Sequence, residues 1–241
     1  MRRLARLLRA DLYQITRDPL LLLFPFLPLL VAALFRFGLP PLEAFLEARF
    51  GFALRTEAGP FLPLVRAELA LMPGMFAGFV AGFLLLEDRD EGLAAYAAAT
   101  PLGKAGYLAL RLILPGLLAL AYAVSMPALA GLGWPDGRAL PLGLLASLEA
   151  PLFGLAIAAV ADNKMEGLSV AKALGILDLA PLAVLAPEPW RSLGRLLPPA
   201  WVAEAAYAAP GRGLLPALAA GAALHLACCF GLALAFFRRA E

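Results

Sequence analysis

The sequence predicts an all-α membrane protein with six transmembrane helices, an N-terminal amphipathic helix at the interface and both termini in the cytoplasm. Three observations lead to this fold class. Hydrophobic residues make up 62% of the 241 positions and charged residues only 16%, whereas soluble proteins are about half apolar. The mean hydropathy is +0.82. Six windows are also long enough to cross a hydrocarbon core, which takes roughly 20 apolar residues.

The chain opens with an amphipathic segment at residues 1–18. Leu4, Leu7, Leu8 and Leu12 recur at helical spacing, while four arginines occupy the other faces. A helix of this kind lies in the membrane interface. Because the hydrophobic stretch that follows is long enough to span the membrane, we interpret the segment as an interfacial helix and not as a cleaved signal peptide.

Six spans follow. Asp18 and Pro19 suit the N-cap and first position of the first helix. Prolines within the spans, such as Pro73 and Pro115, are interpreted as kinks, because neighbouring helices can satisfy the freed carbonyls in a membrane. The connecting stretches are too short for a soluble domain, so residues 1–241 form a single membrane domain. The predicted spans are about 19–39, 64–86, 105–132, 139–161, 168–186 and 213–237.

The distribution of basic residues sets the expected orientation. With the N-terminus inside, 12 of the 20 lysines and arginines fall on the cytoplasmic side, as the positive-inside rule favours. Trp134, Trp190 and Trp201 all fall at the outer boundary, where indole prefers the headgroup layer. On the same outer side, we expect an amphipathic helix over 42–54 and a partly re-entrant hairpin over 187–212.

The most informative segment lies between the second and third spans, at residues 87–102. It contains four acidic residues, which we expect to begin a short surface helix because carboxylates are favoured at a helix N-terminus. Leu93 and Tyr96 would share one face of that helix. The segment is either a solvated turn or a docking helix for another protein, and its apolar, helix-forming run from Leu93 to Ala99 favours docking.

An acidic cluster, a glycine, a short helix and then Thr-Pro-Leu resemble the coupling segment of ABC-2 type export permeases, the membrane subunits of ATP-driven exporters. The loop at 161–172 is similar to one in the drug-export branch of that family, and Leu197 to Trp201 resembles its outer segment. The resemblance implies contact with a separate ATP-binding cassette subunit. The contact residues would be Glu87, Asp88, Asp90, Glu91, Gly92, Leu93, Tyr96, Thr100 and Pro101, with a second cytoplasmic loop at Asp162, Asn163, Lys164, Glu166 and Gly167.

No nucleotide-binding loop occurs in the sequence, so we expect no enzymatic activity here, with ATP and Mg²⁺ bound by the partner. The chain has one histidine and two adjacent cysteines, too few for a metal motif, and its net charge of +2 is too small to suggest nucleic acid. The family resemblance implies a second permease, identical or paralogous, in the inner (plasma) membrane. Ala77-Gly78, Ala81-Gly82 and Ala217 with Gly221 are candidate interfaces.

Three polar residues fall near the middle of predicted spans, namely Glu149, Asp178 and His225. A charge at that depth costs at least about 2.5 kcal/mol, so each is expected to be neutral, paired or facing water. They could join helices, line the substrate path of an exporter, or form the proton relay of an ion-coupled secondary transporter. An apolar outer vestibule suits a lipophilic or amphiphilic substrate, and a haem-export-type permease is a further alternative by fold analogy.

Overall fold

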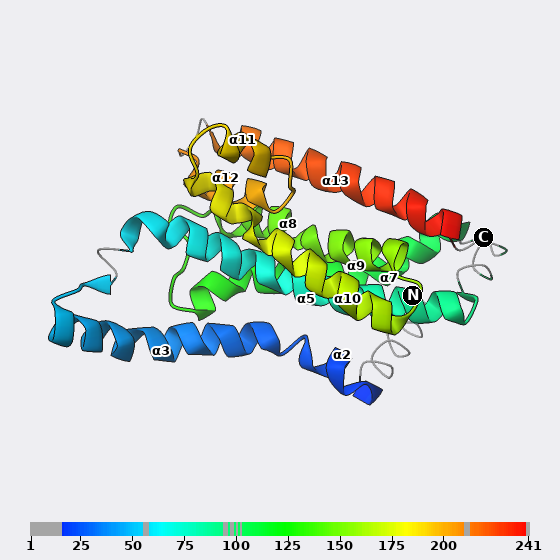
Figure 1. Cartoon of the computed structure of the whole chain (residues 1–241), viewed down its shortest axis with the longest axis horizontal. Coiled ribbons are helices and arrows are strands. Elements are labelled where there is room, and N and C mark those ends of the chain that lie inside the picture. Colours follow the sequence, from blue (N-terminus) through cyan, green and yellow to red (C-terminus); the bar gives the residue numbers. More distant parts are fainter. Residues whose placement is uncertain are drawn as a thin grey trace.

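The computed structural model describes residues 16–54, 58–93, 96, 99, 101, 103–209 and 213–239, which form a bundle of helices without a strand (Figure 1). Of the predicted interfacial helix, residues 1–15 lie outside the described residues. The described part contains six helices long and apolar enough to cross a membrane, which confirms the predicted all-α fold with six spans.

The helical elements along the chain are α2 (Pro19–Leu23), α3 (Leu27–Phe50), η1 (Gly59–Phe61), α5 (Leu62–Asp90), α7 (Gly103–Leu129), α8 (Ala139–Ser147), α9 (Glu149–Val160), α10 (Lys164–Leu174), η2 (Gly175–Leu185), α11 (Trp190–Gly194), α12 (Ala200–Tyr207) and α13 (Leu214–Arg239). The candidate spans are α3, η1 with α5, α7, α8 with α9, α10 with η2, and α13.

The first span differs from the prediction. Helix α2 ends at Leu23, and α3 then runs without interruption to Phe50, through Pro40 and Pro41. The predicted separate helix over 42–54 is therefore wrong, because its first turns belong to α3. The actual stop is Gly51, whose left-handed φ of 66° allows its N–H to bond back to the carbonyl of Glu47.

Helix α5 is the centre of the bundle, and its glycines bring it unusually close to α9. A Cβ placed on Gly78 would lie 2.6 Å from the Cβ of Phe153, and one on Gly82 would lie 2.8 Å from the Cβ of Ile157. The small residues that were candidates for an interface between subunits therefore pack inside one chain. Gly221 of α13 does the same, since its Cβ would lie 2.7 Å from that of Trp201.

The fourth and fifth spans are each built from two pieces. Leu148 separates α8 from α9, and α10 continues into the 3₁₀ helix η2. The fifth span begins at Lys164, not at 168, because Asn163 caps it by accepting a hydrogen bond from the Glu166 N–H at 3.0 Å. Lys164, Glu166 and Gly167 therefore lie in the first turn of a helix and not in a loop as predicted.

The bundle has two distinct ends. Figure 1 shows the start of α2 and the end of α13 at the same end of the molecule, together with the loop between α9 and α10. We call this the acidic end, because it carries residues 87–91. At the opposite, tryptophan end lie α11, α12 and the α7–α8 loop, which Arg138 ties to α12 by donating to the Ala206 carbonyl at 3.0 Å. This end holds Trp134, Trp190 and Trp201 together, as expected for one membrane boundary.

Candidate functional site: the acidic end and an apolar pocket

The sequence suggested that the acidic cluster begins a surface helix, but in the structure it does not. Glu87, Asp88 and Asp90 form the last turn of α5, which continues to Asp90. Carboxylates at a helix C-terminus are disfavoured by the helix dipole. The cluster is therefore stabilised by basic groups from other elements, and these groups connect the ends of four helices.

Asp88 is completely buried and is the anchor of the cluster. Its carboxylate accepts hydrogen bonds from the Tyr107 hydroxyl and from Nε and Nη2 of Arg111. Both partners are buried on α7. A two-nitrogen contact between a guanidinium and a carboxylate is among the strongest hydrogen-bonded pairs in proteins. This contact clamps the end of α5 to the start of α7, on either side of residues 91–102.

Arg89 joins the same end of α5 to α9. Its Nη2 donates to the carbonyls of Ala161 and Asp162, both at 2.9 Å. These carbonyls belong to the unsatisfied groups at the end of α9, so Arg89 acts as its C-terminal cap. Nearby, Lys164 Nζ lies 3.4 Å from Glu87 Oε2. The two predicted cytoplasmic segments thus form one surface.

The residues predicted for the second loop have structural roles at this surface. The Asp162 N–H donates to Glu166 Oε2 at 2.8 Å, and Asp162 Oδ1 accepts from Arg239 of α13 at 3.0 Å. Gly167 allows α10 to approach α5, because a Cβ there would lie 2.8 Å from Leu86 Cδ1. Sequence reasoning missed Tyr107 and Arg111 as partners of Asp88, although their spacing of four residues puts them on one helix face.

The tip of the predicted coupling segment is exposed. Leu93 is 37% exposed and Tyr96 72% exposed, while the Tyr96 N–H donates to the Gly92 carbonyl at 3.0 Å, as in a helical turn. Gly92 adopts a φ of 70°, which only glycine tolerates easily. Asp90, Glu91 and Pro101 are also exposed, whereas Thr100 lies outside the described residues. The exposed residues Asp90, Glu91, Leu93 and Tyr96, which we call the tip, therefore lie next to the buried Asp88–Arg111 pair.

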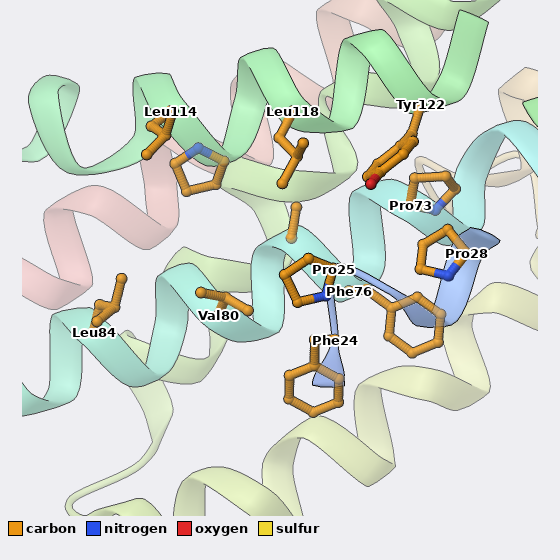
Figure 2. Close-up of a pocket in the computed structure, with 12 residues that line it drawn as sticks. Phe24, Pro25, Pro28, Pro73, Phe76, Val80, Leu84, Leu114, Leu118 and Tyr122 are labelled. Carbon is orange, nitrogen blue, oxygen red and sulfur yellow. The ribbon is translucent and has the colours of Figure 1, made fainter. Parts of the chain in front are cut away.

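A second feature that sequence reasoning missed is an apolar pocket between the α2–α3 break, α5 and α7. It encloses about 510 Å³ including its open mouth. Figure 2 shows Leu114, Leu118 and Tyr122 of α7 on one side of the pocket and α5 with the α2–α3 break on the other. The Tyr122 hydroxyl is the only polar side-chain group among the lining residues, which are Phe24, Pro25, Pro28, Pro73, Phe76, Ala77, Val80, Leu84, Leu114, Pro115, Leu118 and Tyr122.

The structure brings together two of the three polar residues predicted near the membrane centre. His225 Nε2 lies 2.8 Å from Glu149 Oε1, and both side chains are fully buried. Asp178 is separate, and its Oδ1 is buried without a hydrogen-bond partner among the described residues. The three residues therefore do not form one continuous hydrogen-bonded chain in the described structure.

A charged cluster lies at the tryptophan end. Glu204 of α12 accepts hydrogen bonds from Arg191 Nε and Nη2 at 2.8 and 2.7 Å and from Arg195 Nε at 2.9 Å. Burial by itself opposes ionisation of Glu204, but the hydrogen bonds from the two arginines outweigh it and lower the pKa of this carboxyl. The cluster fixes α11 against α12 beside a hollow of about 760 Å³.

Comparison with known proteins identifies the family. The profile of the family described as Fluoroquinolones export permease protein Rv2686c-like matches residues 11–233. The chain belongs to this family. It is 32% identical to the fluoroquinolones export permease proteins Rv2686c and MT2760 of two Mycobacterium tuberculosis strains, over 231 residues that cover 94% of this chain and 90% of each relative. No solved structure is significantly similar to it.

Membership of the Rv2686c-like family confirms the resemblance to drug-export ABC-2 type permeases. The chain is a multi-pass membrane protein and an export permease. The acidic end is therefore a candidate docking site, and the apolar pocket is a candidate substrate site.

Proposed function

We propose that this chain is the permease subunit of an ATP-driven exporter and that it docks a separate ATP-binding cassette subunit at its acidic end. Asp90, Glu91, Leu93 and Tyr96 are the contact residues, and the partner binds the ATP and Mg²⁺. The observation that carries the proposal is the buried Asp88–Arg111 pair. It makes the helices on either side of the exposed tip move together when the tip is displaced.

This mechanism needs stiffness between the contact and the transport path. Arg89 and Lys164 extend the clamp from α5 to the α9–α10 loop, so a push on the tip reaches four helices. We further propose that the acidic end faces the cytoplasm, because 12 of the 20 lysines and arginines fall on that side of the predicted topology. We also propose that the protein lies in the inner membrane and that two permeases, identical or paralogous, form the transport path.

The substrate that we propose is a lipophilic or amphiphilic drug-like molecule, such as a fluoroquinolone. The relatives carry that substrate in their names, and the apolar pocket supports the assignment. Its lining is apolar apart from the Tyr122 hydroxyl, and sites for drug-sized ligands are lined mainly by hydrophobic and aromatic side chains. Its open mouth and apolar lining suit a molecule that enters from the membrane.

The test is recovery of an ATPase subunit with the permease. Replacement of both Glu91 and Tyr96 by alanine is expected to abolish co-purification of the ATPase and ATP-dependent drug efflux while leaving the permease folded. Trp190→Ala is the matched control, because Trp190 is nearly as exposed, at 65% against 72% for Tyr96, but lies at the opposite end. Equal recovery of the ATPase with both variants would contradict the docking site.

The second candidate is an ion-coupled transporter that uses the buried polar residues. The contact between Glu149 and His225 favours it, since protons are carried by such groups in membranes. Transport by the purified chain in vesicles, driven by a proton gradient without nucleotide, would support this candidate and overturn the first.

A further inference from the structure

We infer that Glu149 and His225 form a binding site for a single proton, which latches α13 to α9 inside the membrane domain. His225 is the only histidine in the chain. Its Nδ1 lies 2.7 Å from the carbonyl oxygen of Gly221, and its Nε2 lies 2.8 Å from Glu149 Oε1. Both side chains are shielded completely from solvent.

The partners of the imidazole decide where its hydrogens lie. A backbone carbonyl can only accept a hydrogen bond, so Nδ1 must carry a hydrogen that it donates to Gly221. One further proton then has to lie between Nε2 and Glu149 Oε1, because without it two lone pairs would face each other at 2.8 Å. The proton sits on the carboxyl or on the imidazole, and in either arrangement the pair is neutral overall.

The surroundings disfavour every other protonation state. Loss of the shared proton would leave a carboxylate whose second oxygen, Oε2, has no partner among the described residues. The titratable groups around this carboxylate, Asp178 of η2, Glu68 of α5 and Cys229 of α13, are all acids, so none of them supplies a compensating positive charge. Addition of a second proton would create a net positive charge buried in the membrane domain.

The consequence is a latch between two helices. Few side chains of α13 are buried, and they are small except for His225 and Phe236, so a buried hydrogen bond contributes much to holding this helix. Gly221 has two roles beside this contact: its carbonyl accepts from Nδ1, and its lack of a side chain lets α13 approach Trp201 of α12. A relay would need a second proton partner, and Asp178 Oδ1 makes no hydrogen bond in the described structure.

The single histidine makes this inference directly measurable. In the full chain, labelled with ¹⁵N-histidine and held in nanodiscs, NMR is expected to show a hydrogen on Nδ1 and a hydrogen-bonded Nε2 at neutral pH. An imidazole protonated at Nε2 alone would overturn the inference. No transport assay is involved, so the result is independent of the proposed exporter function.

Variants separate the proton site from the latch. Glu149→Gln still offers an N–H to Nε2, so the tautomer with hydrogen on Nδ1 should persist. Glu149→Leu removes the donor and is expected to speed amide exchange in α13 by about five- to thirty-fold, since loss of a buried hydrogen bond costs about 1–2 kcal/mol. The matched control is Glu68→Gln, which should leave α13 unchanged. If Glu149→Leu does not fold, the tautomers of Glu149→Gln and of the wild type still decide the proton site. Equal exchange in the Leu and control variants would refute the latch.

Discussion

Replacement of Asp88 by asparagine tests the clamp at the acidic end. Asparagine has the shape of aspartate but no charge, so it removes the negative charge that faces the buried Arg111 guanidinium. Arg111 is only 6% exposed and Asp88 is 0% exposed, which leaves water little access to compensate. Removal of one partner from such a pair costs about 3–5 kcal/mol, a large part of a typical folding free energy of about 5–15 kcal/mol.

The assay is equilibrium unfolding of the purified chain in mixed micelles, followed by helical circular dichroism. The matched control is Asp90→Asn, two residues further along the same helix. Asp90 is exposed, so this change should cost no more than about 0.5 kcal/mol. A second variant, Asp88→Asn combined with Arg111→Met, removes both charges and should recover most of the loss, because replacing a whole buried pair is often nearly neutral.

The reasoning is refuted if Asp88→Asn and Asp90→Asn have the same unfolding free energy. It is also refuted if the double variant is less stable than Asp88→Asn alone, since the cost would then come from lost packing and not from the loss of charge pairing with Asp88. If the single variant folds, we expect it to bind the ATPase subunit but to transport poorly, because the tip is intact while its base is loose.

Three further predictions concern packing, substrate binding and pH. Gly78→Ala should destabilise the fold by about 1–3 kcal/mol through overpacking. The control Gly116→Ala, whose Cβ would meet nothing within 4 Å, should be neutral or stabilising. Equal unfolding midpoints for the two variants would contradict the close α5–α9 contact. Leu118→Trp should fill the apolar pocket and weaken drug binding roughly tenfold, a loss of about 1.4 kcal/mol, while Leu117→Trp on the neighbouring exposed position should not; fluorescence titration with drug measures both. Because the pKa of Glu204 is lowered by folding, its ion pairs stabilise the native state above the ordinary glutamate value of about 4.3 and are lost as the pH falls through the lowered value. Glu204→Gln should therefore remove at most about 1 kcal/mol at pH 7 and flatten the acid limb of the stability curve, and an unchanged limb would exclude this cluster as its source.

The sequence predicted the number and order of the spans because length and hydropathy are local properties. A stretch of about 20 apolar residues must cross the bilayer, and its backbone must be helical there. Helix ends were less accurate. The first span was expected to end at about residue 39, but the helix continues through Pro40 and Pro41 and ends at Gly51, where a left-handed residue closes it. Glycine and proline can each end a helix, and only the surrounding contacts decide which of them does so.

The family and the exporter class were predictable from the chain, since they depend on composition, span count and the motif at residues 87–102. The roles within the motif were not. Asp88 and Asp90 are the same residue type two positions apart, yet one is buried against Arg111 and the other is exposed. Which of them faces another helix depends on how α5 and α7 pack, and no local pattern contains that information.

The sequence by itself determined that this protein is an α-helical membrane permease, because apolar length and charge placement fix how a chain meets a bilayer. Only the tertiary structure decided which of its polar residues pair. Glu149 and His225 lie 76 positions apart, and Glu87 of α5 pairs with Lys164 at the start of α10. Such pairs form where helices lie side by side. For the buried pair, the low-dielectric interior makes the free energy of each polar group depend strongly on its partner.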